Sequence, residues 1–592
     1  MDFMNNLIQS SSSIVAMDGS VQEQLVLTRH WTGSTCTFTL INESQHDVQL
    51  KEVVLFEGNH GLREDTWQYG EGYQMLSQYE GAMGCMDDIS YSDKDHYKLP
   101  ALEGYQTMYN MTWLFSEDKY SVLGFSSCHR FNGALHFNKK QYKITLDLEG
   151  LTLEKQRRFV LEEFVCLEGH DRELLLQQFG ECINRNHSPL GINQPTKLPT
   201  GWCSWYCYGP QINESIIQDN LDGILEHQLH LAYIQVDDGY QPKMGDWLEP
   251  NPAFGMDIKA LCRRIREKGF EPGIWVAPFI AEETSKVFTE HPDWFIKDKH
   301  QQPLRSDKIS FGGWRRGPWY MLDGTHPEAR DYLRHVFRTM REDWGCYYFK
   351  LDANMWGAMP GGYYYDAKAT RTEAYRLGMQ ACIEGAGEKS FILGCNAPMW
   401  PSLGVVHGMR VTSDITRDWD TISRLSRECF HRNWQHKTLW VNDPDCLVLE
   451  NRQVHVVDAA GKVHKTLTEL SKDELSYHRA YILASGGMVL NSDRIGDMHA
   501  DSIRWLKKLL PPMGQAARFD DIGFTIGKIK RNHDTLVFLF NATNDMIEKS
   551  ITCPKASCVL DFWREEVMCT KQRELAVKLP PHSARVLQIK TI

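Results

Sequence analysis

The sequence lacks long apolar runs and concentrated blocks of basic residues. No stretch reaches the roughly 18 consecutive apolar residues of a membrane-spanning helix, and the N-terminus has neither the basic nor the apolar segment of a secretion signal. Lys and Arg number 65 against 77 Asp and Glu, a net charge of −12, so no basic footprint for nucleic acid is present. We expect a cytoplasmic protein that binds neither membranes nor nucleic acid.

Metal-binding and cofactor-binding patterns are also missing. The 16 cysteines form no CxxC pair, and the closest two, Cys203 and Cys207, do not have zinc-ligand spacing. The sequence has no HExxH, no P-loop, no GxGxxG after a strand and no GxSxG. We therefore expect no metal and no cofactor, and free thiols rather than disulfides.

Three regions differ in their hydrophobic pattern, and 592 residues are too many for one domain. Residues 1–190 contain short alternating runs, as at 36–41 and 142–146, and predict an N-terminal β-sandwich. Residues 191–510 alternate short apolar segments with helical patterns, and residues 511–592 return to the β pattern of a small antiparallel domain. A helix at 172–184 and a proline-containing linker at 186–199 are expected between the first two regions.

The central region contains eight short apolar segments that we predict to be parallel strands. They lie at 201–205, 232–238, 272–277, 347–352, 391–395, 409–414, 439–443 and 488–492. Helical patterns stand between them, among them 258–268 and 329–341. Eight successive βα units predict a (β/α)8 TIM barrel.

Polar and aromatic residues stand at the carboxyl ends of these segments, where barrel enzymes build their active sites. They are Trp205, Asp237, Asp238, Trp275, Asp352, Cys395, Asn396, Asp414, Asp443 and Asp493. Any single Asp could equally cap the following helix, but a cluster of carboxylates at one rim costs stability through repulsion and desolvation. Carboxylates beside aromatic rings are what glycoside hydrolysis needs: one ionised carboxylate attacks the anomeric carbon, and a protonated one donates to the leaving oxygen.

Motifs along the barrel, from the first strand to the seventh and in order, resemble those of glycoside hydrolase family 36 α-galactosidases, in particular the compact bacterial members. The matching segments are PTGWCSWY (199–206), QVDDGY (235–240), GDW (245–247), GIWVAPF (273–279), HPDW (291–294), YFKLD (348–352), ILGC (392–395), GMR (408–410) with Asp414, and WVNDPDC (440–446).

The resemblance implies a retaining exo-glycosidase that removes terminal α-D-galactosyl residues by double displacement. Asp352 would be the nucleophile and Asp414 the acid/base, which must begin protonated through burial or a neighbouring negative charge. Lys350 would donate to sugar hydroxyls and keep Asp352 ionised, and Arg410 would contact the sugar.

The other binding residues follow from the same resemblance. Asp237 and Asp238 would hold O4 and O6, Cys395 would lie near O2, and Trp275 would form the pocket wall. A weaker match suggests that Trp67 reaches over the pocket from the N-terminal region. Trp205 is either a substrate contact or, like Trp202, barrel packing.

Alternatives remain at several positions. Asp418 is a rival acid/base. For Asp246 with Trp247, and for Asp443 with Asp445, the alternative to a role at the active site is that they serve only to order loops. Asn396 departs from the small residues that many family members carry, so α-N-acetylgalactosaminidase is the nearest alternative. A galactosyl transferase and a non-catalytic carbohydrate-binding protein are the others. The sequence leaves open the linkage and aglycone preference, whether the chain forms a homo-oligomer, and whether a signal peptide once preceded it.

Overall fold

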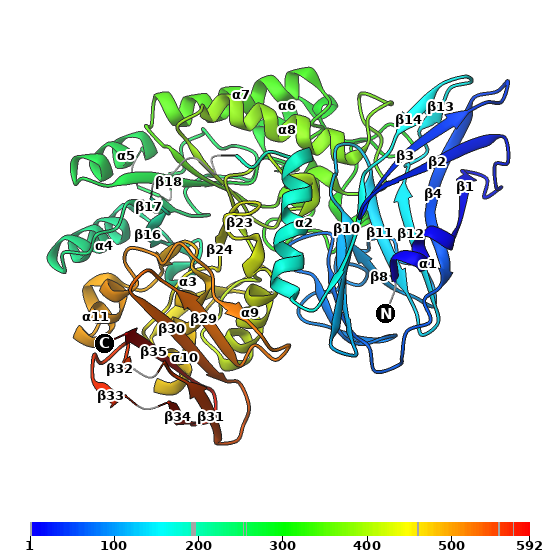
Figure 1. The fold of residues 1–592 in the computed structure, drawn as a ribbon. Helices are drawn as coiled ribbons and strands as arrows, with labels where there is room; N and C mark the ends of the chain where they lie inside the picture. The colour runs from blue at the N-terminus through cyan, green and yellow to red at the C-terminus, as the bar shows by residue number, and fades with distance from the viewer. Residues whose placement is uncertain are drawn as a thin grey trace.

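The structure, a computed structural model, describes residues 3–190, 197–252, 254–255, 257–458, 461–554, 557–571 and 573–591. Two antiparallel sheets come first, a parallel barrel lies in the middle, and a smaller antiparallel unit ends the chain (Figure 1). The predicted fold class is confirmed. Across these residues, no helix combines the length and apolar character that a membrane crossing requires.

The N-terminal region is a sandwich of two antiparallel sheets. One has the order β1-β4-β12-β11-β8 with β13 beside β4, and the other β14-β3-β15-β10-β9-β5-β6-β7 with β2 beside β3. The strands of the first are Ser11–Ala16, Val48–Asn59, Gln141–Asp147, Asn132–Phe137, Gln106–Tyr109 and, for β13, Thr152–Leu153. Those of the second are Arg158–Val160, Thr35–Asn42, Phe164–Gly169, Lys119–Phe125, Met111–Ser116, Trp67–Glu71, Gln78–Ala82, Cys85–Asp88 and, for β2, Leu25–Thr32. Phe56 of β4 packs against Phe38 and Phe164 of the facing sheet, which places a hydrophobic core between the sheets.

Eight parallel strands form the barrel in the order β24-β23-β22-β21-β18-β17-β16-β27. They are β16 (Thr200–Cys203), β17 (Tyr233–Val236), β18 (Glu271–Val276), β21 (Tyr348–Leu351), β22 (Phe391–Gly394), β23 (Gly408–Arg410), β24 (Val441–Asp443) and β27 (Val489–Asn491). The Met488 N–H donates to the Asn442 carbonyl at 3.0 Å and closes the ring between the last strand and β24. Each predicted strand is present.

Two strand ends differ from the prediction. Trp205 begins a short helix, α3 (Trp205–Tyr208), and Asp414 lies four residues beyond Arg410, where β23 ends. The chain leaves the sheet after β23 because buried Glu428 accepts hydrogen bonds from the Ser413 N–H at 2.5 Å and from its hydroxyl at 2.9 Å. Asp414 therefore stands on a loop rather than on a strand.

Helices alternate with the barrel strands. They are α4 (Glu214–Glu226), α5 (Ile258–Glu267), α6 (Lys286–Glu290), α7 (Pro327–Glu342), α8 (Arg371–Ala386), α9 (Trp419–His431), α10 (Lys472–Ser485) and α11 (Ala500–Lys508), with α1 (Phe3–Gln9) and α2 (Arg172–Asn186) earlier in the chain. The three helices expected from the sequence correspond to α2, α5 and α7. Thr370 with Glu373, and Ser471 with Glu474, form capping boxes that fix where α8 and α10 begin. Part of the predicted linker, 191–196, lies outside the described residues.

The C-terminal region is a small antiparallel unit. A sheet of order β28-β29-β30-β35-β32-β33 lies near the pair β31-β34, and Leu539, Ile551 and Leu579 belong to one buried cluster. Its strands are β28 (Arg518–Phe519), β29 (Ile526–Lys530), β30 (Asp534–Asn541), β31 (Ile547–Thr552), β32 (Ser557–Asp561), β33 (Val567–Thr570), β34 (Glu574–Leu579) and β35 (Ser583–Thr591).

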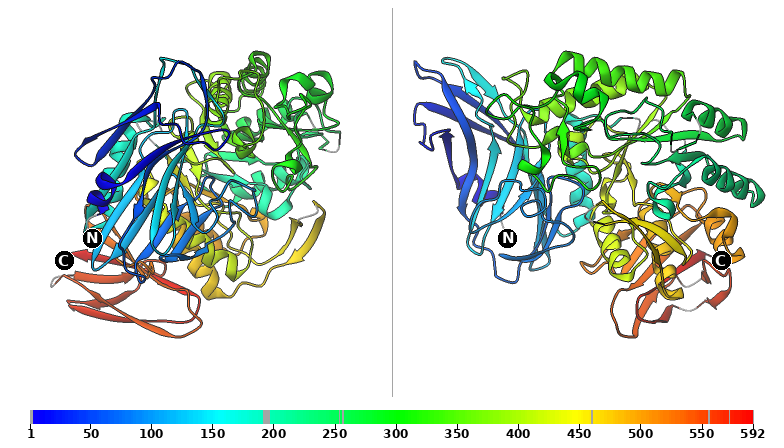
Figure 2. Two further views of the ribbon diagram at one scale, coloured as in Figure 1. Left: turned by 90° about the vertical axis from the view of Figure 1, so that its right-hand side faces the viewer. Right: turned by 180° about the vertical axis from the view of Figure 1, so that it is seen from behind.

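Two short ribbons are inserted among the barrel loops, and the sequence analysis did not predict either. One pairs β19 (Ile280–Glu282) with β20 (Trp319–Met321). The other is a hairpin of β25 (Gln453–Val457) and β26 (Val463–Leu467), between β24 and α10. Figure 2 shows this hairpin as a gold ribbon that projects from the barrel.

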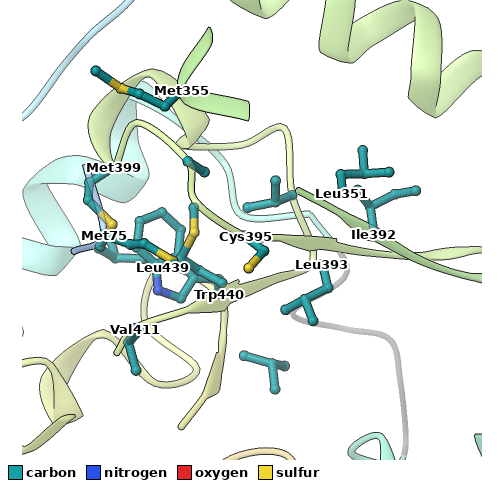
Figure 3. Packing of buried hydrophobic residues seen from close by; sticks show 14 of the residues in the cluster. Met75, Leu351, Met355, Ile392, Leu393, Cys395, Met399, Val411, Leu439 and Trp440 are labelled. Carbon is teal, nitrogen blue, oxygen red and sulfur yellow. The ribbon is translucent and has the colours of Figure 1, made fainter. Parts of the chain in front are cut away.

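The sandwich is fastened to the barrel by a buried ion pair. Arg432 and Glu71 are both fully buried, with Arg432 Nε 3.0 Å from Glu71 Oε1. The backbone joins the same regions, because the Met399 N–H donates to the Tyr73 carbonyl and the Met75 N–H to that of Ala397. Met75 lies beside Met399 and Trp440 (Figure 3). These contacts hold a segment of the sandwich at the barrel rim.

Candidate active site

A cavity of about 900 Å³ opens at the carboxyl ends of the barrel strands. Most of the predicted site residues line it, namely Trp205, Asp237, Asp238, Trp275, Lys350, Asp352, Cys395, Asn396 and Asp414. Arg410 and Trp67 are not among its lining residues. The strand order therefore gathers side chains that are separated by up to about 200 positions in the sequence.

Asp352 follows β21 and is held by two donors. The Trp275 indole N–H donates to Oδ2 at 3.0 Å, and the Ala353 N–H donates to Oδ1 at 2.7 Å. Ala353 itself has a φ of 54°, which turns the chain sharply after the carboxylate. Burial raises the pKa of Asp352, and the positive charge of Lys350 opposes that rise. Lys350 thus favours the ionised form.

Asp414 is placed differently from what we expected. Its side chain is 62% exposed, so burial does not surround it. One oxygen, Oδ1, accepts hydrogen bonds from Arg410 Nη2 at 2.8 Å and from the Tyr206 hydroxyl at 3.1 Å. The carboxyl group is therefore oriented by fixed donors while it remains open to the cavity.

Arg410 lies behind Asp414 rather than beside the sugar position. Its side chain is 1% exposed, and Nη2 is 2.5 Å from Asp445 Oδ2. Asp445 also accepts the Ile415 N–H at 2.6 Å, and burial raises the pKa of this carboxyl to about 7 against the opposing charge of Arg410. Asp443 in turn accepts the Asp445 N–H at 3.0 Å. Arg410, Asp443 and Asp445 therefore form a buried network that fixes the loop carrying Asp414.

Asp237 and Asp238 are buried and paired with cations. Lys350 Nζ is 3.0 Å from Asp237 Oδ2, and Gln235 donates to the same oxygen at 2.6 Å. Arg315 grips Asp238 with two donors, Nε at 2.9 Å from Oδ2 and Nη2 on Oδ1. The sequence analysis missed Arg315, although it stands in the conspicuous segment GGWRRGP (312–318) of the long loop after β18.

The sandwich contributes a wall of the cavity, but not through Trp67. Trp67 lies on β5, paired with Phe115 and Ala82 inside the sheet, and the cavity wall is instead formed by Met75, Leu76, Tyr91, His96 and Tyr97. The Tyr97 hydroxyl donates to Asn396 Oδ1 at 2.7 Å. The pattern of a single sequence could not indicate these residues, because their position depends on how the sandwich docks onto the barrel.

Several alternatives find a structural role. Asp418 caps α9 by accepting the Thr421 N–H at 2.9 Å. Trp202 is fully buried and donates to the Asp493 carbonyl, so it packs inside the barrel. Asp246 accepts the Lys286 N–H at 2.9 Å and orders a loop. Within the described ranges, no three His, Cys, Asp or Glu side chains are grouped as metal ligands.

Part of the barrel resembles a known family. Residues 222–389 match the melibiase family model. The chain is 25% identical over 178 residues to the myogenesis-regulating glycosidase of Mus musculus. This match covers 28% of this chain and 24% of that protein. It is 26% identical over 188 residues to the bifunctional alpha-galactosidase/sucrose kinase AgaSK of Mediterraneibacter gnavus. That match covers 30% of this chain and 19% of AgaSK. The matched segments thus span about a quarter or less of these relatives' own length.

A solved structure extends the likeness to almost the whole fold. The GH36 α-galactosidase AgaA of Geobacillus stearothermophilus, in a variant bound to raffinose, superposes with a TM-score of 0.65 at 12% identity, covering 98% of this chain and 89% of that one. The chain thus shares the fold of a GH36 α-galactosidase, and its residues 222–389 resemble the melibiase family.

Proposed function

We propose that the protein is a retaining α-galactosidase that hydrolyses terminal, non-reducing α-D-galactosyl residues. The observation that carries this proposal is the presence of Asp352 and Asp414 on one cavity together with the buried Lys350–Asp237 pair. The first carboxylate stands beside a cation, and the second stands open to the cavity with one oxygen held by donors. Such unequal surroundings suit two different roles in double displacement.

In the first step, an oxygen of Asp352 attacks the anomeric carbon and the bond to the leaving oxygen breaks. The Asp414 carboxyl gives its proton to that oxygen. Trp275 keeps Asp352 oriented through its indole N–H.

In the second step, Asp414 acts as a base. It takes a proton from water, the water oxygen attacks the anomeric carbon, and the ester bond to Asp352 breaks. Arg410 and Tyr206 hold Asp414 in place for both steps. Galactose would leave with its α configuration retained.

Selection of galactose is assigned to Asp237 and Asp238. Both carboxylates are at most 2% exposed, so a sugar whose hydroxyl does not reach them lacks a hydrogen bond to a buried charged acceptor, worth roughly 1.5–3 kcal/mol. Their cations, Lys350 and Arg315, hold them in place for contact with the hydroxyls that would be O4 and O6.

Turnover of aryl α-D-galactoside tests this function. We expect clear hydrolysis of the galactoside, much weaker hydrolysis of aryl α-D-glucoside, and loss of both in Asp352→Ala. Near-normal activity of Asp352→Ala would contradict the assignment.

The alternative activity, α-N-acetylgalactosaminidase, rests on Asn396. Its side chain lies at the cavity beside Cys395, but Tyr97 already occupies its amide oxygen. That hydrogen bond leaves the amide nitrogen as the group able to meet O2 or an acetamido oxygen. Aryl α-N-acetyl-D-galactosaminide is therefore assayed beside the galactoside; a preference for it would keep the mechanism and change the substrate.

We further propose a cytoplasmic location and small imported α-galactosides as substrates. Buried cysteines such as Cys203, Cys207 and Cys395 are free thiols, which suits a reducing compartment. Fractionation of cells that express the chain would test the location, and recovery outside the cytoplasm would contradict it.

A further inference from the structure

The cavity has two ends of different chemistry. The inner end holds Asp237, Asp238, Lys350 and Asp352, where we place the galactosyl ring. The outer end is formed by the loop after β23, the start of α9 and the β25–β26 hairpin. About 900 Å³ lies near the upper limit for a small-molecule site, so space remains for a substantial leaving group.

The hairpin presents aliphatic surface to this outer end. Six aliphatic residues line it, namely Ile415, Val454, Val456, Val457, Leu467 and Leu470. Ile415, Val454 and Leu470 are buried, whereas Leu467 is 65% exposed. An exposed aliphatic side chain on a cavity wall gains free energy when a ligand covers it.

The polar groups of the outer end are largely engaged already. Asp418 caps α9, Glu474 accepts the Ser471 N–H at 2.7 Å, and Thr468 accepts the Arg452 N–H at 3.0 Å. The Trp419 ring is stacked on His582 at 4.1 Å, so one of its faces is occupied. Thr466 and Glu469 remain exposed at the rim. His455 Nδ1 also lacks a hydrogen-bond partner, but the other polar groups just described are engaged and offer a further sugar ring few new hydrogen bonds.

We propose that the outer end is a subsite for an apolar leaving group, an alkyl chain or aromatic ring attached to the glycosidic oxygen, and that Leu467 determines this specificity. The inference rests on the proposed function and names its substrate class. The hairpin strands pair with each other in a two-stranded ribbon, so Leu467 belongs to an appendage rather than to the barrel that carries the chemistry.

The test compares octyl α-D-galactoside with methyl α-D-galactoside. In the unmodified chain, we expect a KM for the octyl glycoside at least about tenfold below that of the methyl glycoside, because burial of its chain against the hairpin contributes to binding. Leu467→Asp should raise the octyl KM about tenfold and leave the methyl KM within about twofold. Leu377→Asp is the matched control: Leu377 is 37% exposed on α8 and does not line the cavity.

Other outcomes would overturn the proposal. Equal KM values for the two glycosides would do so. So would a KM for raffinose that is lower than the octyl KM and that Leu467→Asp raises. Calorimetric titration of both glycosides into Asp352→Asn reads affinity without turnover. If the unmodified chain hydrolyses neither glycoside, the proposed function fails. The subsite would still be supported if Asp352→Asn binds the octyl glycoside more tightly than the methyl glycoside and the double variant with Leu467→Asp loses this difference. Absence of any octyl preference in that titration would remove the subsite.

Discussion

The barrel rim and the β25–β26 hairpin form two ends of one cavity but are held in different ways. At the rim, Lys350 pairs with Asp237, and Arg410 with Asp445, through side chains that are at most 6% exposed. The hairpin pairs within itself, and Leu467 stands 65% exposed. A change at the rim should therefore remove chemistry or stability, whereas a change on the hairpin should alter only which glycosides bind.

The largest expected effect is at the nucleophile. Asp352→Asn keeps the shape of the side chain but removes the attacking charge, so kcat should fall by at least roughly 10⁴-fold. Hydrolysis of aryl α-D-galactoside measures this loss. An activity within about tenfold of the unmodified chain would show that another group attacks.

Asp414→Asn should depend on the leaving group. Loss of the proton donor should lower kcat/KM for an alkyl galactoside by roughly 10²–10⁴-fold, while an aryl galactoside with an activated leaving group should lose much less at the first step. An equal loss for both substrates would argue against Asp414 as the acid. Asp418→Asn is the control, because Asp418 lines the same cavity and caps α9; it should keep the activity on both substrates.

Substitution of two adjacent arginines compares a buried ion pair with an exposed one. Arg315→Ala leaves Asp238 unpaired at 2% exposure, so it should destabilise the fold by about 3–5 kcal/mol. Arg316 is 36% exposed and 3.3 Å from Glu282, so Arg316→Ala should cost less than about 1 kcal/mol. Denaturant unfolding measures both values. Equal losses would contradict the burial argument.

The pH profile should respond to Lys350. Burial raises the pKa of Asp352 and Lys350 lowers it, so removal of the positive charge in Lys350→Met should raise this pKa further. Because attack requires the ionised carboxylate, the acidic limb of kcat/KM should move to higher pH. Lys350→Arg keeps the charge and should leave the limb near its original position. An unmoved limb in Lys350→Met would mean that this limb does not report Asp352.

The smallest effect is expected at Tyr97. Tyr97→Phe removes one hydrogen bond to Asn396, worth about 1 kcal/mol. The freed amide should alter the ratio of galactoside to N-acetylgalactosaminide turnover while kcat for the galactoside changes little. Parallel assays of the two aryl glycosides measure the ratio, and an unchanged ratio would remove Asn396 as a specificity residue.

The barrel could be predicted from the sequence because each strand is a short apolar segment followed at once by a polar or aromatic residue. That local signal alone predicts that Asp237, Trp275 and Asp352 lie at one rim. The same signal placed Asp414 at a strand end, but the chain leaves the sheet earlier because Glu428 and Asp445 hold the loop after β23 from other parts of the chain. The acid/base role of Asp414 came from the resemblance, and its position on a loop and its exposure were not foreseen.

The residues that complete the cavity depend on long-range contacts. Arg315 meets Asp238 across 77 positions, and Tyr97 meets Asn396 across 299. No periodicity records such pairs, which explains why Arg315 and Tyr97 were missed and Trp67 was misplaced. The hairpin did leave a signal in the sequence, since Val454 and Val456 alternate with polar or other residues before a Gly-containing segment and Val463 follows it.

The stereochemistry of the first product tests the central claim most directly. Proton NMR of the reaction with aryl α-D-galactoside, recorded before mutarotation, distinguishes the two anomers of the released galactose. Double displacement through Asp352 predicts that α-galactose appears first and the β anomer grows only later. Initial release of β-galactose would contradict the retaining mechanism and the roles given to Asp352 and Asp414.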